Sequence, residues 1–298
     1  MGKDIISDVL EQAPNRRSLL KKIGIASAAI GAGMAAGGLK LQADPATPTY
    51  TDVLQFALNL EYLEAEFYTV ATTGQTISAM GIPTSGQGNT GQTTGGNQVN
   101  FANNTVFTGT IANQIANDER NHVLLLRTAL ANAPSVSGSS TTGPIAKPPI
   151  NLNALGIGYA NILQFLTLAR VFEDIGVSAY GGGVPYLVPG GAAILQTAAR
   201  ILATEAEHVA NIRLQVAKLA IPTTPALDGV DILPPPSGTL FFSVDPNSPA
   251  NDPNGALTPI RTPGQVLYLA YGNAAGVTSG GFFPSGVNGN LVTSTAHA

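Results

Sequence analysis

Four stretches of the sequence repeat apolar residues every three or four positions, the spacing that lines one face of an α-helix. They span residues 52–71, 108–131, 155–180 and 192–219. No stretch of similar length alternates apolar and polar residues as a half-buried strand would. The pattern therefore predicts an all-α fold, a bundle of four amphipathic helices.

The segments between and after these helices are irregular. Residues 72–104 are mainly Gly, Thr, Gln and Asn, which predicts a long loop between the first two helices, too polar to form a core. Gly181-Gly182-Gly183 is expected to end the third helix. Residues 221–298 are rich in Pro, Gly, Asn and Asp, but scattered aromatic residues and a short helix expected over 265–271 indicate that this extension packs on the bundle.

The N-terminus is typical of a twin-arginine export signal. Arg16-Arg17 is followed by an uncharged, Gly- and Ala-rich stretch over 23–39, and Ala43 offers a small residue for cleavage. A membrane anchor is disfavoured because the stretch is short and only weakly apolar. We therefore expect residues 1–43 to engage the twin-arginine export machinery. The mature protein, with its bundle over 50–220, would be periplasmic or extracellular and without a stable membrane span.

Composition excludes several classes of function. The 298 residues carry a net charge of −4, only 11% are charged, and no basic stripe with interleaved aromatics predicts a nucleic-acid partner. The absence of cysteine excludes disulfides, thiolate catalysis and Cys-based zinc sites.

Two copies of a Glu-x-x-His motif carry the candidate chemistry. Glu119 and His122 share one helix face, as do Glu205 and His208, because residues three apart on a helix are neighbours. Each pair lies on the apolar face of its helix. The two motifs use two of the only three histidines in the chain. One such motif alone is usually a solvated pair or a helix cap, but its recurrence favours a shared site.

The helix before each motif carries a matching glutamate in its apolar stripe. Glu61 precedes Tyr68 by seven residues, and Glu173 precedes Tyr180 by seven. A duplicated helix pair, packed about a pseudo-two-fold axis, would bring the two Glu-x-x-His motifs face to face. Glu61 and Glu173 would then complete the two ends of the site.

Charge balance indicates what such a site would hold. Buried carboxylates need compensating charge, and four of them are balanced by two divalent cations when both imidazoles are neutral. Carboxylate and imidazole ligands without thiolates suit iron or manganese. The sequence therefore predicts a dinuclear iron or manganese site, with these ligands: Glu61, Glu119, His122, Glu173, Glu205 and His208.

Other polar residues near these helix faces have open roles. Glu64 lies about 60° from Glu61 around the helix, so it is either an alternative ligand or a group that hydrogen-bonds the ligands. Tyr68 and Tyr180 are either core aromatics or hydrogen-bond donors to ligand carboxylates. Arg170 either neutralises a nearby acid or lays its stem along apolar surface. The remaining polar positions are predicted to face solvent: Asp52, Gln55, Asn59, Glu66 and Glu207.

These motifs resemble the ferritin-like superfamily of carboxylate-bridged dinuclear proteins. The segment from Leu60-Glu61 to Tyr68 is similar to the first helix of bacterioferritin and rubrerythrin, whose ligand Glu also precedes a Tyr by seven, and this favours Glu61 over Glu64. The two Glu-x-x-His motifs match the second and fourth helices, and Glu173 matches the third. A closer resemblance, to the ferritin-like proteins grouped with plant desiccation-related proteins, rests on residues 56–68, 172–180, 261–267 and 281–289.

Together with the predicted export signal, the resemblance implies an exported ferritin-like protein that reacts with oxygen or peroxide. Ferroxidase- or peroxidase-like protection during oxidative or desiccation stress is the leading expectation, with Glu119 and Glu205 as bridging ligands. A manganese catalase is one alternative, and a non-catalytic structural or stress-protection protein stabilised by metal is the other. The oligomeric state stays open, a homo-oligomer included.

Overall fold

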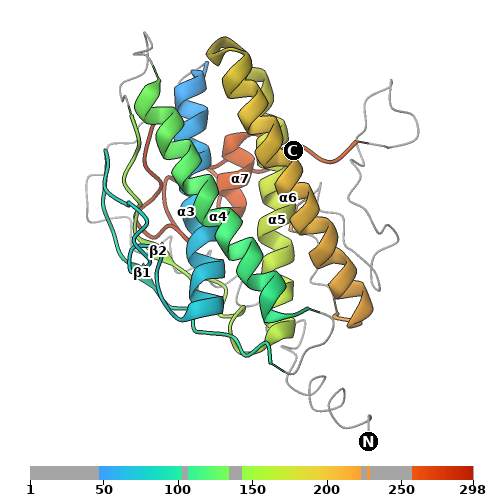
Figure 1. The fold of residues 1–298 in the computed structure, drawn as a ribbon. Helices are drawn as coiled ribbons and strands as arrows, with labels where there is room; N and C mark the ends of the chain where they lie inside the picture. The colour runs from blue at the N-terminus through green and yellow to red at the C-terminus, as the bar shows by residue number, and fades with distance from the viewer. Residues whose placement is uncertain (1–46, 103–106, 134–142, 223–226, 229–256, 298) are drawn as a thin grey trace, which may run out of the picture. The chain divides into compact units, whose positions relative to one another are not determined.

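The computed structural model describes residues 47–102, 107–133, 143–222, 227–228 and 257–297 (Figure 1). All belong to the unit that spans Leu39–Ala298. The predicted export signal over 1–43 lies outside the described residues.

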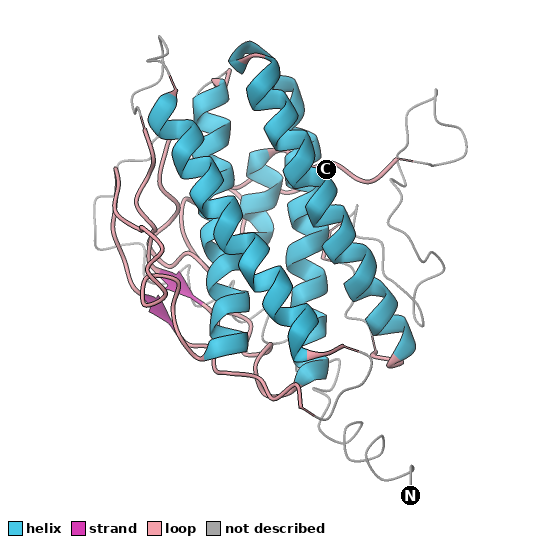
Figure 2. Ribbon diagram, viewed as in Figure 1, coloured by secondary structure: helices cyan, strands magenta, loops and turns pink. Residues whose placement is uncertain are grey.

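Four long helices build this unit, and Figure 2 shows them packed along one another. They are α3 (Tyr50–Thr73), α4 (Gly109–Asn132), α5 (Ile162–Leu187) and α6 (Ala192–Lys218). Helix α3 packs mainly against α4, and α5 packs mainly against α6. The predicted all-α bundle is confirmed. None of the helices in the described residues is long and apolar enough to cross a membrane.

Side-chain caps fix where α3, α4 and α5 begin. Thr49 and Asp52 form a reciprocal capping box at α3, and the Thr108 hydroxyl accepts a hydrogen bond from the Ile111 N–H at α4. Helix α5 begins at Ile162, seven residues later than predicted. Gly158 has a φ of +119° there, and the Asn161 side chain caps the first turn by accepting from two backbone N–H groups.

The prediction that Gly181-Gly182-Gly183 ends α5 is wrong, because the helix continues to Leu187. A Cβ added to Gly182 would lie only 2.0 Å from the backbone oxygen of Arg261, whose N–H donates to the Ser178 oxygen at 3.0 Å. Gly181 and Gly182 therefore leave room for the C-terminal extension to lie against the helix, and the glycine run does not end it.

The long polar loop between α3 and α4 packs on the bundle. Its Ile77 and Val99 side chains are buried in the main core. Within it, β1 (Thr93–Thr94) pairs in parallel with β2 (Ile150–Asn151) from the connection between α4 and α5. The loop thus packs its apolar side chains against the bundle, and its backbone pairs with a segment distant in the sequence.

The prediction of a solvated face on α3 is wrong, since Asp52, Gln55, Asn59 and Glu66 are all buried. Loops from elsewhere in the chain supply their polar partners. Asn290 donates to Asp52 at 2.7 Å, the Gln55 amide donates to the Gly143 oxygen at 3.0 Å, and the Asn59 amide donates to the Asn288 oxygen at 2.9 Å. Helix α3 is therefore covered on all sides. Glu207, by contrast, is exposed as predicted.

The C-terminal extension packs on the bundle where it is described. It contains α7 (Pro263–Ala270), close to the helix predicted over 265–271. The ring of Phe282 packs edge-on against that of Phe172 on α5, with centroids 5.0 Å apart. Phe283 and Tyr271 are also fully buried.

Candidate metal centre

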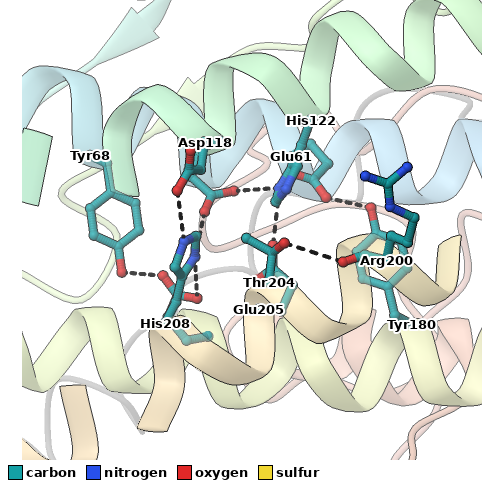
Figure 3. Close-up of polar contacts among 11 residues, drawn as sticks. Glu61, Tyr68, Asp118, His122, Tyr180, Arg200, Thr204, Glu205 and His208 are labelled. Atoms are coloured by element: carbon teal, nitrogen blue, oxygen red, sulfur yellow. Dashed lines mark hydrogen bonds and ion pairs between the residues drawn. The ribbon is translucent and has the colours of Figure 1, made fainter. Parts of the chain in front are cut away.

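All six predicted ligand residues converge inside the bundle, one or two from each helix. Figure 3 labels four of them, Glu61, His122, Glu205 and His208. Glu61 comes from α3 and Glu173 from α5. Helix α4 contributes Glu119 and His122, and α6 contributes Glu205 and His208. The four glutamates are completely buried, and each histidine is 7% exposed.

Two overlapping groups of acidic and imidazole side chains in the described residues are able to hold a metal ion. One contains Glu61, Glu119, His122 and Glu205, and the other contains Glu119, Glu173, Glu205 and His208. Within each group the candidate ligand atoms all lie within 4.8 Å of one another. Glu119 and Glu205 belong to both groups. This arrangement is compatible with a dinuclear site in which two carboxylates are shared.

Both histidines turn Nδ1 toward the carboxylates. His122 Nδ1 lies 3.2 Å from Glu205, 3.3 Å from Glu61 and 3.4 Å from Glu119. His208 Nδ1 lies 3.0 Å from Glu119 and 3.3 Å from Glu173. The two rings therefore occupy equivalent places in the two halves of the site.

Two tyrosines connect the halves. Tyr68 on α3 donates a hydrogen bond to Glu173 on α5, and Tyr180 on α5 donates one to Glu61 on α3. Both hydroxyls thus hold a candidate ligand carboxylate, which is one of the two roles predicted for them. The crossed pattern also matches the predicted pseudo-two-fold relation between the helix pairs.

Most of the site's polar atoms have no hydrogen-bond partner. Among described residues, eleven buried side-chain atoms lack one, and eight of these belong to the six residues of the site. They include both oxygens of Glu119 and Glu205 and the Nδ1 atom of each histidine. Unpaired buried polar atoms cost free energy, so their concentration in one place indicates that a ligand completes them.

In the metal-free protein, burial and neighbouring charges favour the protonated forms of several glutamate and histidine side chains of the site. Burial and the neighbouring carboxylates raise the pKa of Glu205 well above 4.5, and burial raises that of Glu173. Burial disfavours the imidazolium of His208, but Glu173 and Glu119 outweigh this and raise its pKa to about 12. The pKa of His122 is raised as well, where Glu61, Glu119 and Glu205 outweigh burial. Protons therefore supply the positive charge that metal ions would otherwise bring.

Glu64 belongs to neither metal-binding group but is buried beside them. Burial, with Glu205 and other carboxylates nearby, raises the pKa of Glu64 well above 4.5. The residue at the equivalent position of α5 is Gly176. A Cβ there would lie 2.8 Å from a Glu205 oxygen and 3.2 Å from a Glu64 oxygen, so this glycine leaves room for both carboxylates.

Sequence reasoning missed Asp118, whose carboxylate lies 3.4 Å from Nε2 of His208. Its only sequence signal is its place directly before Glu119 in the motif, because the contact crosses from α4 to α6. Arg170 takes the first of its two predicted roles. It is buried and pairs with Asp174 at 3.4 Å, which also accepts from Arg213 at 2.9 Å.

Comparison with protein families agrees with this geometry. A family model described as a ferritin-like domain matches residues 49–218, which cover the four helices and all six residues of the site. A search of curated proteins found no match. The matched region is more than half of the chain. The chain therefore belongs to the ferritin-like domain family.

Proposed function

We propose that the protein is an exported dinuclear iron or manganese protein that reacts with oxygen or peroxide. In this proposal the ligands of the two ions are Glu61, Glu119, His122, Glu173, Glu205 and His208, with Glu119 and Glu205 bridging. Its role is protection against oxidative or desiccation stress.

The observation that carries the proposal is the set of eight buried atoms on those six residues that have no hydrogen-bond partner. Four buried carboxylates with two neutral imidazoles carry a charge of −4, which two divalent ions balance. The donor set of oxygens and imidazole nitrogens suits iron or manganese better than a soft metal. The residues therefore fit the group that the ferritin-like family implies.

The chain's own residues bind, orient and shield the centre. Tyr68 and Tyr180 hold Glu173 and Glu61 in place, and burial of all four glutamates keeps bulk water out. Bound iron or manganese would supply the redox chemistry toward oxygen or peroxide. The two histidines are the only residues of the six with any exposure, so they mark the side from which a small oxidant would enter.

A matched pair of variants tests the proposal. Glu119→Gln with Glu205→Gln removes both shared carboxylates, whereas Glu207→Gln changes an exposed glutamate on α6. We expect the double variant to fold but to lose Fe(II) oxidation and peroxide consumption, and Glu207→Gln to keep both.

Other results would replace this proposal. Rapid oxygen release from peroxide by the manganese-loaded protein would indicate a catalase. Loss of thermal stability in the double variant, with no turnover in the wild type, would indicate a structural metal site. Export has its own test, since Arg16→Lys with Arg17→Lys should leave the protein in the cytoplasm.

A further inference from the structure

The two halves of the centre share the ligand and tyrosine positions but differ beside them. One difference is Glu64 on α3 against Gly176 on α5, and another is the position before each Glu-x-x-His motif. Asp118 precedes Glu119 on α4, and Thr204 precedes Glu205 on α6. Figure 3 shows both side chains beside the centre. A carboxylate on one side and a hydroxyl on the other give the two histidines different surroundings.

Asp118 contacts the outer nitrogen of His208. Its Oδ2 lies 3.4 Å from His208 Nε2, while His208 Nδ1 faces Glu119 and Glu173 at 3.0 and 3.3 Å. When the ring gives up its Nδ1 proton to bind a metal ion, a carboxylate at Nε2 keeps the other proton on Nε2 and fixes the orientation of the ring.

Among the described residues, none offers His122 such a partner. The Thr204 hydroxyl donates instead to the Arg200 backbone oxygen of its own helix, at 3.2 Å. No side chain in the described part of the structure hydrogen-bonds Nε2 of His122. The inner nitrogens both face carboxylates, three at Nδ1 of His122 and two at Nδ1 of His208. At the outer nitrogen, the difference between the two rings is the Asp118 carboxylate.

We propose that Asp118 is a positioning residue for His208, and that it makes the two metal positions unequal, so that the position at His208 fills first. This inference rests on the proposed metal centre. It goes beyond that proposal by assigning an order of loading, and by naming a residue outside the six ligands that sets it.

The test is a stepwise titration of the metal-free protein with Mn²⁺, followed by calorimetry and by electron paramagnetic resonance. We expect two resolved steps, with the signal of isolated Mn²⁺ at one equivalent and that of coupled ions only at two. Asp118→Asn should weaken the first step roughly 10-fold or more and leave the second nearly unchanged. Thr204→Asp introduces a carboxylate at the equivalent position of the other half and should strengthen the second step.

Two further variants identify which position is the tight one. His122→Gln should retain the tight step, and His208→Gln should lose it. Thermal unfolding of each metal-free variant separates an effect on binding from an effect on folding.

Four results would overturn the inference. They are equal steps in the wild type, coupled ions at one equivalent, an unaltered first step in Asp118→Asn, or a tight step that survives His208→Gln. Failure of the wild type to bind Mn²⁺ or Fe²⁺ at all would instead overturn the proposed metal centre, and the inference with it.

Discussion

Tyr68 on α3 donates its hydroxyl hydrogen bond to Glu173 on α5, 105 residues away in the sequence. Tyr180 repeats the contact in the opposite direction, toward Glu61. Each tyrosine therefore holds the glutamate of the other helix pair. These crossed contacts tie the two halves of the bundle together at the site itself.

Replacing Tyr68 with Phe should loosen Glu173. The buried carboxylate would lose its donor, which should lower the free energy of unfolding by about 1–3 kcal/mol. Metal affinity should fall at the half of the site that contains Glu173. Denaturant unfolding of the metal-free variant and a metal titration measure the two effects. Tyr180→Phe is the matched variant for Glu61, and unchanged unfolding and binding in both would contradict the assigned role of the tyrosines.

Gly176→Ala should abolish two-metal binding while the helix still forms. The added methyl group would lie 2.8 Å from a Glu205 oxygen, closer than van der Waals contact allows, so Glu205 would have to move. Gly109→Ala is a suitable control because its methyl group would lie at an ordinary 3.5 Å from Phe101. Metal content after dialysis checks the prediction, and two metals retained in Gly176→Ala would contradict it.

The metal-free protein should be less stable at pH 9 than at pH 6. The pKa of His208 is raised from 6.5 to about 12, so its stabilising effect is complete below pH 6.5 and lost as the pH rises toward 12. The pKa values of Glu64 and Glu205 are raised above 4.5 by burial, so the folded state also loses stability as the pH rises above that value. All three groups act in the same direction.

Bound metal should reverse this dependence of stability on pH, because metal ions replace the protons on the histidine and glutamate side chains. Stabilisation by Mn²⁺ should therefore increase with pH, and binding should release protons. Thermal unfolding with and without Mn²⁺ at both pH values, and calorimetry in buffers of different ionisation enthalpy, provide the measurements. Binding without proton release would contradict this account.

A buried ion pair away from the metal centre should matter for stability alone. Lys147 lies 3.4 Å from Glu66 and donates to the Gly91 oxygen at 3.0 Å and to Thr93 at 2.8 Å, so it fastens the loop to α3. Lys147→Met would leave the Glu66 carboxylate buried without a cation and should cost about 3–5 kcal/mol.

The double variant Lys147→Met with Glu66→Gln should recover much of that loss, since the amide oxygen still accepts from the Ile77 N–H. Metal content should be normal in both variants. A fully stable Lys147→Met protein would contradict the role of the pair.

The fold and the convergence of the six candidate ligand residues could be predicted because the signals are local. Apolar spacing determines which face of each helix is buried, and a glutamate such as Glu61 or Glu173 inside that stripe must lie inside the bundle. The seven-residue spacing to Tyr68 and Tyr180 then indicates the duplication. None of these inferences needs knowledge of distant contacts.

The features that were not predicted depend on segments far apart in the sequence. Asn59 has the pattern of a solvent-facing residue, but Asn288, 229 residues away, supplies its partner. The glycines at 181–183 have the composition of a helix end, but the helix continues through them and Gly182 accommodates the Arg261 backbone. Asp118 contacts His208 across two helices, which the spacing within either helix does not reveal.

The most direct measurement is a crystal structure of the natively purified protein, with anomalous scattering at the iron and manganese edges and elemental analysis of the same sample. We predict two iron or manganese ions per chain, roughly 3.5–4 Å apart, between His122 and His208 and bridged by Glu119 and Glu205. A metal-free interior in protein that has been offered both metals, or metal bound only elsewhere on the chain, would contradict the account.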